Sequence, residues 1–318
     1  MNNRYEQMYR ATTLYYIENE TMDAIAKQLG TSRPTVSRLL KMARDSGLVR
    51  ISISDHVYDG SKVVNYIAEQ FDVNVHLVPI RSALSGSARL TQVARRAASL
   101  IADTTQTDEY IGVAWGTTLS AVAAELPKVP IPGSVVVQMN GSSNPESSGI
   151  PYTGSILQAF GKKFGSEVVF FPVPAFFDHV ETKRMLWKER SVKRVLELRE
   201  QLNVAIFGVG AFNGAIPSHV YSAGYFTPHE LAHLQGDGVV GDICTVLIRE
   251  DGTWQDIEAN QRATGLTPTE MQRIKHRICV VADPKRAQPV LGALRAGVVT
   301  DLVIDDVSAQ ALAKRLKI

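Results

Sequence analysis

Apolar residues recur at helical spacing in three short stretches near the start of the chain. They predict a helix over residues 5–18 and two more helices within residues 22–41, with Gly30 suited to a left-handed turn between them. The apolar positions are Met8, Ala11, Leu14 and Tyr15 in the first helix, Ile25, Ala26 and Leu29 in the second, and Val36, Leu39 and Leu40 in the third. Residues 48–54 then alternate apolar and polar side chains, which predicts a strand.

Further along the chain, apolar strand-like runs alternate with helical patterns. The strands are predicted over residues 73–79, 110–114, 134–139, 167–171, 203–208, 240–248, 277–282 and 301–304. The helices are predicted over residues 61–71, 89–102, 118–126, 153–164, 180–201, 228–235, 285–296 and 306–316. Such alternation is typical of an α/β domain, with a mostly parallel sheet covered by helices on both faces.

The spacing within residues 22–41 is that of a helix-turn-helix, whose second helix enters the DNA major groove. Ala26 is small where the two helices cross, Ser32 stands at the cap position, and Pro34 falls in the first turn, where its missing N–H costs little. The strand over residues 48–54 predicts a winged variant. An ordinary helical hairpin is the alternative reading.

The outward face of the second helix carries residue types that reach base edges and phosphates. Arg38 and Thr35 are candidates for base contact, whereas Ser37, Lys41 and Arg44 suit phosphate contact. The candidate DNA-contacting residues are Ser32, Arg33, Thr35, Ser37, Arg38, Lys41, Arg44 and Arg50. A solvated helix face is the alternative.

Charge distribution favours DNA over that alternative. The whole chain has a formal net charge of only +2, yet residues 27–50 contain six Lys or Arg and one acid. Residues 1–54 carry eight basic and five acidic side chains, hence +3, and the other residues sum to −1. Positive charge is therefore concentrated around the helix-turn-helix.

A chain of 318 residues is too long for a DNA-binding unit alone. We predict a DNA-binding domain over residues 1–54, a polar linker over 55–60 and an effector-binding and oligomerisation domain over 61–318. There is no run of eighteen apolar residues and no apolar N-terminal signal region, so we expect a cytoplasmic protein without a membrane partner.

The two cysteines, Cys244 and Cys279, stand in apolar runs and are expected to be buried, inert thiols. His229 and His233 have helical spacing but no third ligand beside them, so a solvated or packed pair is favoured. We therefore expect neither a metal nor a cofactor.

Four predicted loops at the carboxyl ends of strands carry small polar or charged residues, where open α/β sheets bind ligands. The turn at Gly116, Thr117 and Thr118 can hold a phosphate against a helix N-terminus. The other loops contain Gln138, Asn140 and Gly141, then Gly208 and Gly210, then Asp283 and Lys285. Each could be mere turn geometry, but together they indicate a small-molecule site. Neither a Walker pattern nor a GxGxxG fingerprint is present, which disfavours ATP and NAD.

The chain resembles the SorC family of bacterial transcriptional regulators, related to DeoR-type sugar regulators. The resemblance is carried in order by residues 31–40, 112–118, 208–210, 240–242, 260–266 and 297–305. It implies a Rossmann-like effector domain resembling sugar-phosphate isomerase and CoA-transferase folds, a phosphorylated sugar as inducer, and dimers or tetramers.

By position, the resemblance implies effector contacts from Gly116, Thr117, Thr118, Asp242 and Lys285. Asn260 and Arg262 match a motif that is either structural or ligand-binding. Some family members hold their sugar through a lysine Schiff base after the strand that matches residues 134–139. No lysine stands there in this chain, so noncovalent binding is expected.

The leading hypothesis is an effector-controlled transcriptional repressor of carbohydrate catabolism genes, a homo-oligomer that binds operator DNA and a sugar phosphate. The full set of expected effector contacts is Gly116, Thr117, Thr118, Gln138, Asn140, Gly141, Gly210, Asp242 and Lys285. Trp115 and Phe177 are further candidates for shaping the site. The alternative is a sugar-phosphate isomerase-like enzyme with an attached DNA-binding domain, although no acid–base or nucleophile pair demands chemistry.

Overall fold

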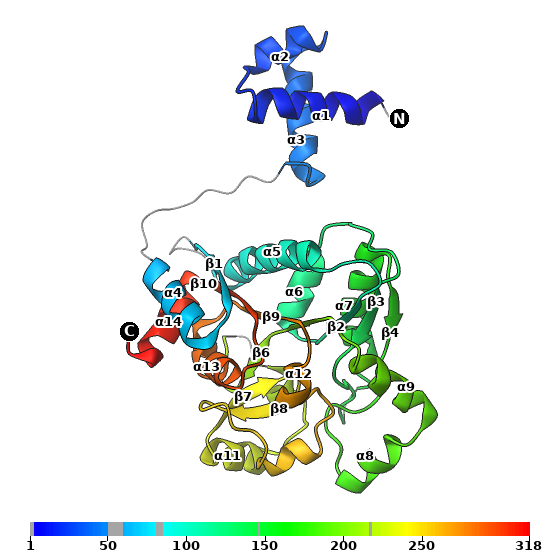
Figure 1. Cartoon of the computed structure of the whole chain (residues 1–318), viewed down its shortest axis with the longest axis vertical. Coiled ribbons are helices and arrows are strands. Elements are labelled where there is room, and N and C mark those ends of the chain that lie inside the picture. The colour runs from blue at the N-terminus through cyan, green and yellow to red at the C-terminus, as the bar shows by residue number, and fades with distance from the viewer. Residues whose placement is uncertain (1–2, 50–59, 81–84, 146, 216–217) are drawn as a thin grey trace. The chain divides into compact units, whose positions relative to one another are not determined.

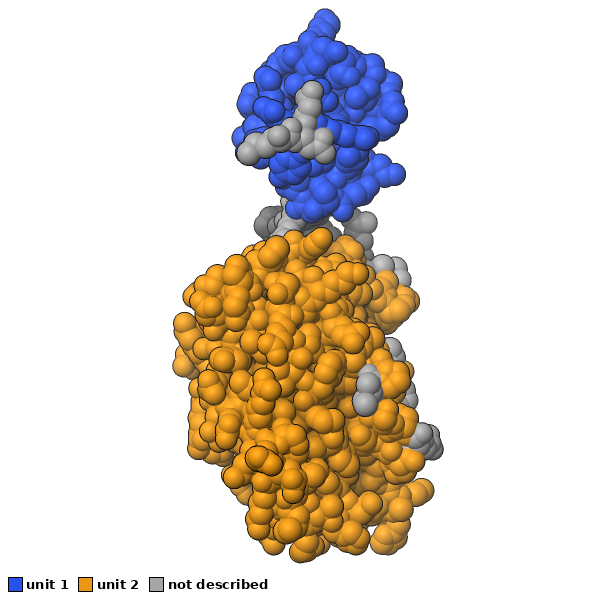
Figure 2. All heavy atoms as spheres, turned by 90° about the vertical axis from the view of Figure 1, so that its right-hand side faces the viewer, with its two compact units in different colours: residues 1–56 blue, residues 57–318 orange. Residues whose placement is uncertain are grey.

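The computed structural model describes residues 3–49, 60–80, 85–145, 147–215 and 218–318. The chain divides into two compact units, residues 1–56 and 57–318, which are coloured separately in Figure 2. The predicted strand over 48–54 has only residues 48 and 49 in the described part, and neither is in a strand. The rest of that strand, Arg50 and most of the predicted linker lie outside the described residues.

The described part of unit 1 contains three helices, α1 (Asn3–Tyr16), α2 (Met22–Gln28) and α3 (Arg33–Asp45). Thr21 caps α2 by accepting a hydrogen bond from the Ala24 amide at 3.2 Å. Ser32 stands at the N-cap of α3, but its hydroxyl pairs with the Thr35 hydroxyl at 2.9 Å and caps no backbone amide, contrary to the prediction. The buried core lies where the three helices meet and consists of Met8, Ala11, Ile25, Ala26, Val36, Leu39, Leu40 and Ala43.

Unit 2 is a mixed α/β structure around a seven-stranded parallel sheet (Figure 1). The strand order is β1-β10-β9-β5-β2-β3-β4. The strands are β1 (Asn74–Val78), β2 (Tyr110–Val113), β3 (Val135–Gln138), β4 (Glu167–Val169), β5 (Val204–Phe207), β9 (His276–Val281) and β10 (Asp301–Asp305). Each was predicted as a strand, with ends that differ by a few residues.

Successive residues of the strands point to opposite faces of the sheet and build two cores. In β5, Val204 and Ile206 belong to one core, whereas Ala205 and Phe207 belong to the other. The first core is covered by α5 (Gly86–Thr104), α6 (Thr117–Glu125) and α7 (Ile150–Phe164). The second is covered by α4 (Gly60–Phe71), α9 (Arg190–Arg199), α13 (Ala287–Arg295) and α14 (Asp306–Leu316).

The prediction of one strand over residues 240–248 is wrong. Two strands, β7 (Val239–Ile243) and β8 (Val246–Arg249), form an antiparallel hairpin there, and β7 also pairs with β6 (Val209–Ala211) to give a separate three-stranded sheet. The turn consists of Cys244 and Thr245, which both have positive φ values of 49° and 69°. A hairpin turn of this backbone type is normally marked by Gly or Asn, and their absence hid it.

The prediction of one helix over residues 180–201 is also wrong. The chain forms α8 (Val180–Leu186) and α9, which are separated at residues 187–189. The remaining elements are the short helices α10 (His219–Ser222), α11 (Pro228–Gly236) and α12 (Pro268–Met271), and two 3₁₀ turns, η1 (Glu258–Gln261) and η2 (Pro284–Arg286).

Phe160→Ala should lower the free energy of unfolding of unit 2 by about 3–5 kcal/mol, because it removes a fully buried ring between α7 and the sheet. Chemical denaturation measures the change. The control is Phe170→Ala, since Phe170 is 36% exposed and should lose much less. Equal losses in the two variants would contradict the packing of α7 described here.

Candidate functional site

A cleft lies beyond the carboxyl ends of the central strands, where the strand order reverses at β2. The cleft and its mouth together hold about 500 Å³ of space, which includes open solvent. The segment joining β2 to α6 lines one side, and residues from the start of α10, the β7–β8 hairpin and η2 line the others. The polar and charged lining residues are Trp115, Thr117, Thr118, Asn140, Ser218, His219, Asp242, Cys244, Thr245 and Arg286, beside Gly116, Gly208 and Gly210.

The N-terminus of α6 opens into this cleft. Gly116 stands at the cap position with a φ of +144°, a conformation that L side chains rarely adopt. The first intrahelical hydrogen bond joins the Ser120 amide to the Gly116 carbonyl at 2.9 Å. The amides of Thr117, Thr118 and Leu119 therefore precede the helical ladder, and together with the helix dipole they favour an anionic group.

Asp242 is buried in the cleft wall on β7. Its Oδ2 accepts a hydrogen bond from the Thr245 amide at 3.1 Å, so the hairpin turn orients the carboxyl group. A Cβ at Gly210 on the paired strand β6 would overlap Asp242 Oδ1, which makes glycine necessary there. Burial raises the pKa of Asp242 to about 6, although Tyr221, the Thr245 amide and Arg286 all act in the opposite direction.

Two acceptor atoms of the cleft make no hydrogen bond of normal geometry to the described residues. They are Asp242 Oδ1 and Asn140 Oδ1, which belong to side chains only 5% and 2% exposed, and the Tyr221 hydroxyl group is the donor that interacts with the Asp242 carboxyl group. Buried polar atoms without partners are rare in folded proteins, because each loses its hydrogen bonds to water. A ligand that donates hydroxyl hydrogens would satisfy both atoms.

Six of the nine expected effector contacts line the cleft: Gly116, Thr117, Thr118, Asn140, Gly210 and Asp242. Gln138 and Gly141 lie behind it. Gln138 Nε2 donates to the Asn140 carbonyl at 2.8 Å, and Gln138 Oε1 accepts from the Phe171 amide at 3.0 Å. Both residues therefore shape the Asn140 loop instead of facing the cleft.

Lys285 is exposed and is absent from the cleft lining, where its neighbour Arg286 is found. Arg286 Nη1 donates to the Val209 carbonyl on β6, and Arg286 Nε lies 3.9 Å from Asp283 Oδ2. The guanidinium group acts electrostatically on Asp242. The sequence prediction named Lys285 where the structure has Arg286, because periodicity does not tell which of two adjacent cations in a 3₁₀ turn faces inward.

Phe177 also lies away from the cleft, in the core beside the Trp187 ring at 5.8 Å. Sequence reasoning missed Ser218, His219 and Val220, which belong to the start of α10 and line the cleft. A four-residue helix leaves no periodic signal. The His219 ring lies 4.8 Å from the ring of Tyr152 on α7, so α10 contacts one of the helices that cover the parallel sheet.

In unit 1, the outward side chains of α3 form a polar, basic surface. Ser32, Arg33, Ser37, Arg38, Lys41 and Arg44 are exposed, and Thr35 is half-buried. Arg44 Nη1 donates to the Tyr16 hydroxyl at 3.2 Å, and Arg33 Nε lies 4.0 Å from Asp23 Oδ2. Because these contacts are weak and exposed, the cations remain accessible to a polyanion.

Among the described residues, no group of three or more His, Cys, Asp and Glu could hold a metal ion, and no helix is long and apolar enough to cross a membrane. His229 and His233 instead line a surface groove beside α11, together with Glu230, Asp237 and Arg262. Cys244 and Cys279 are both buried, and burial raises the pKa of Cys279 to about 12 and that of Cys244 still further above its usual range.

An α/β ligand-binding unit joined to a small helical unit with a basic helix face is the architecture of a ligand-responsive regulator. Residues 55–314 match the family described as "Putative sugar-binding domain". A deoxyribonucleoside regulator from Bacillus subtilis is 30% identical over 308 residues, which cover 96% of each chain. The sorbitol operon regulator from Klebsiella pneumoniae is 22% identical over 95% of each chain.

Solved structures agree with these sequence matches. A domain described as a "possible sugar-binding transcriptional regulator" from Arthrobacter aurescens is 40% identical, with a TM-score of 0.75, and matches 81% of this chain and 99% of that one. The full-length sorbitol operon regulator SorC shares the fold over 98% of this chain and 99% of that chain, with a TM-score of 0.78. The chain therefore belongs to the SorC family of sugar-binding transcriptional regulators, as its motifs indicated.

Asp242→Asn should change the free energy of unfolding in a pH-dependent way. In the ligand-free protein, the folded-state pKa of about 6 exceeds the ordinary value of 3.8, so this carboxyl group contributes most below pH 4 and loses its contribution as the pH rises through 6. The variant should thus gain up to about 3 kcal/mol relative to the original chain between pH 4 and pH 7.5. Urea unfolding at several pH values measures this gain. Asp256→Asn is the control, because Arg249 lowers the pKa of that exposed carboxyl group, and a pH-independent difference for Asp242→Asn would contradict the raised pKa.

Proposed function

We propose that this protein is a sequence-specific DNA-binding repressor of carbohydrate catabolism genes, and that noncovalent binding of a phosphorylated sugar or polyol controls it. The observation that carries the proposal is the pair of buried acceptors, Asp242 Oδ1 and Asn140 Oδ1, which make no hydrogen bond of normal geometry and lie in the same cleft as the α6 N-terminus. Sugar hydroxyls suit the acceptors and a phosphate suits the helix end. The names of relatives, which refer to deoxyribonucleosides and sorbitol, support this class of effector.

The phosphate is assigned to the amides of residues 117–119, with the Thr117 and Thr118 hydroxyl groups beside them and Arg286 as the cation. Asp242 and Asn140 would accept hydrogen bonds from the sugar hydroxyls. Residues 140–143 contain no lysine, which supports noncovalent binding. We assign Lys285 to the exposed rim, where it could act only on ligand atoms that project from the cleft.

In unit 1, α2 and α3 are proposed to form a winged helix-turn-helix, with α3 in the DNA major groove. Arg38 and Thr35 would contact bases, and Ser32, Arg33, Ser37, Lys41 and Arg44 the phosphate backbone, joined by Arg50 from the wing. A homo-oligomer in the cytoplasm would place pairs of α3 helices on the two half-sites of an operator. Effector binding then changes the affinity for the operator only if the ligand prefers one arrangement of the subunits.

A thermal-shift screen of free and phosphorylated pentoses, hexoses and polyols tests the effector assignment. A ligand that binds the folded state raises the melting temperature, and phosphorylated compounds should give the larger shifts. No shift with any of them would contradict the proposed effector class. Turnover of ribose or glucosamine phosphates by the protein would instead support the isomerase alternative.

Arg38→Ala should weaken operator binding by about 1–3 kcal/mol, a loss of roughly five- to 150-fold, because it removes a side chain that can pair with a guanine edge. Fluorescence anisotropy with operator DNA measures the affinity. Arg10→Ala, which removes an exposed cation from α1, is the control and should have a much smaller effect. Loss of effector affinity together with DNA affinity would show that the variant is misfolded.

Thr118→Asp should weaken binding of the phosphorylated effector by at least about tenfold, since it adds a negative charge where the phosphate is proposed to bind. Operator binding should survive. Ser120→Asp adds the same charge to the exposed side of α6 and serves as the matched control. Titration calorimetry checks both, and equal effector affinity in the two variants would remove the phosphate assignment.

A further inference from the structure

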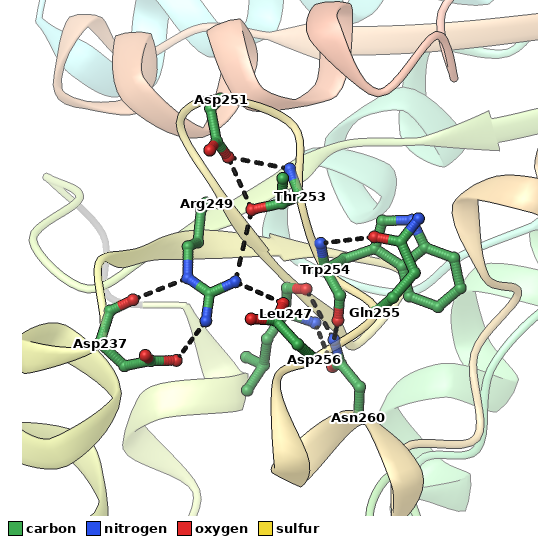
Figure 3. A network of polar contacts seen from close by, with 9 residues as sticks. All are labelled: Asp237, Leu247, Arg249, Asp251, Thr253, Trp254, Gln255, Asp256 and Asn260. Atoms are coloured by element: carbon green, nitrogen blue, oxygen red, sulfur yellow. Dashed lines mark hydrogen bonds and ion pairs between the residues drawn. The ribbon is translucent and has the colours of Figure 1, made fainter.

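Residues 260–266 are one of the segments that carry the family resemblance, yet they contribute no side chain to the cleft described above. Their polar side chains bind other backbone segments instead. Asn260 Oδ1 accepts from the Leu247 amide at 2.7 Å, while Asn260 Nδ2 donates to the carbonyls of Leu247 at 2.9 Å and Trp254 at 2.8 Å (Figure 3). The Asn260 amide group therefore fixes this segment to strand β8 of the small sheet.

The next polar residue of the segment reaches two other places. Arg262 Nη1 donates to the Phe177 carbonyl at 3.1 Å, and Arg262 Nη2 lies 3.3 Å from Glu230 Oε1 on α11. The backbones also pair, since the Phe177 amide donates to the Arg262 carbonyl at 2.9 Å and the Thr264 amide to the Ala175 carbonyl at 3.1 Å. Residues 262–264 therefore run beside residues 175–177.

Thr264 extends this contact to the loop after β3. Its side chain is buried, with 1% exposed. Thr264 Oγ1 accepts from the Gly141 amide at 3.1 Å, and the hydroxyl hydrogen is directed to the carbonyl of Pro174 at 2.8 Å or Ala175 at 3.0 Å. Arg199 Nη1 holds the Thr264 carbonyl at 3.0 Å. One hydroxyl group thus links three segments that are far apart in the sequence.

Gly141 is the point at which this link meets the cleft. Its carbonyl accepts from Trp115 Nε1 at 2.9 Å, and its neighbour Asn140 carries one of the two unpartnered acceptors. A Cβ at Gly141 would overlap the carbonyls of Val173 and Pro174, so the loop is packed tightly against the segment that Thr264 also binds. Trp115 and Asn140 both line the cleft, and both depend on where Gly141 lies.

We propose that Thr264 is a positioning residue, which holds the Asn140–Gly141 loop and the Trp115 indole in the arrangement that forms the cleft. Removing the hydroxyl would leave the buried Gly141 amide without its acceptor, a situation that backbone amides avoid by moving. The importance of this arrangement for effector recognition rests on the function proposed above. The positioning itself does not.

Hydrogen exchange on the ligand-free, full-length chain tests the proposal. In Thr264→Val the Gly141 amide should exchange at least tenfold faster than in the original chain, whereas Thr264→Ser, which keeps the hydroxyl, should stay within about threefold. Amides of β10, residues 301–305, are the internal reference and should not change. Thr264→Ala removes the hydroxyl without adding a methyl group, and it replaces Thr264→Val if that variant does not fold.

Equal exchange at Gly141 in the Val, Ala and Ser variants would overturn the proposal. The same conclusion follows if the amides of Gly141 and of β10 accelerate equally, because Thr264 would then support only the stability of the whole unit. A 5-fluorotryptophan signal of Trp115, identified by its loss in Trp115→Phe, should move in Thr264→Val and not in Thr264→Ser. An unmoved signal in Thr264→Val would also count against the proposal.

Titration with ribose 5-phosphate separates this inference from the proposed function. If the original chain binds it, Thr264→Val should bind at least tenfold more weakly and Thr264→Ser nearly normally. Unchanged affinity in Thr264→Val would overturn the link to recognition. If ribose 5-phosphate and the other screened sugars fail to bind the original chain while Gly141 exchange still accelerates in Thr264→Val, the positioning role stands and the proposed effector class fails.

Discussion

The parallel pairing of β2 with strands on both of its sides constrains everything around the cleft. Ile111 is in register with Val136 on β3 and with Val204 on β5. The three adjacent strands β3, β2 and β5 therefore end at the same edge of the sheet, and the loops that follow them meet there. The first strand of the small sheet begins at Val209, only one residue, Gly208, separates it from β5, and the small sheet therefore lies at the same edge. The hydrogen-bonded register of the strands therefore brings these separate segments together.

This arrangement gives the cleft two chemically different parts. The α6 N-terminus and Arg286 supply donors and positive potential, whereas Asp242 and Asn140 supply buried acceptors. A ligand with an anionic group and several hydroxyl groups would satisfy both parts at once. Because ionising the buried Asp242 costs free energy, ligand hydroxyl groups that bind it would also recover part of that cost. Such recovered free energy is available to bias a regulator between two states.

Much of this could be predicted from the sequence, and the exceptions have physical reasons. Each strand of the parallel sheet was expected, because buried strands between turn residues are continuous apolar runs, as in residues 278–282. The hairpin at Cys244 and Thr245 was not, because neither residue signals a turn. Within the cleft, Thr118 was found from its place after a strand, and Asp242 was found through the family resemblance. Arg286 and His219 were not, since their inward orientation depends on contacts made by short helical turns.

The sequence alone likewise could not distinguish residues that line the cleft from residues that support it. Gln138 and Asn140 are two apart, yet one faces the Phe171 backbone and the other the cleft. Thr264 is 123 positions from Gly141, and only the folded chain brings its hydroxyl group to that amide.

The burial of both native thiols has a practical consequence for following this protein in solution. Cys244 and Cys279 are the only cysteines of the chain, and burial keeps both protonated at neutral pH, where a thiol reacts slowly with alkylating reagents. A cysteine introduced at an exposed position of α3, such as Ser37, would therefore be modified selectively without prior removal of the native ones. Fluorescent or spin labels could then report how the helical unit responds when a ligand enters the other unit.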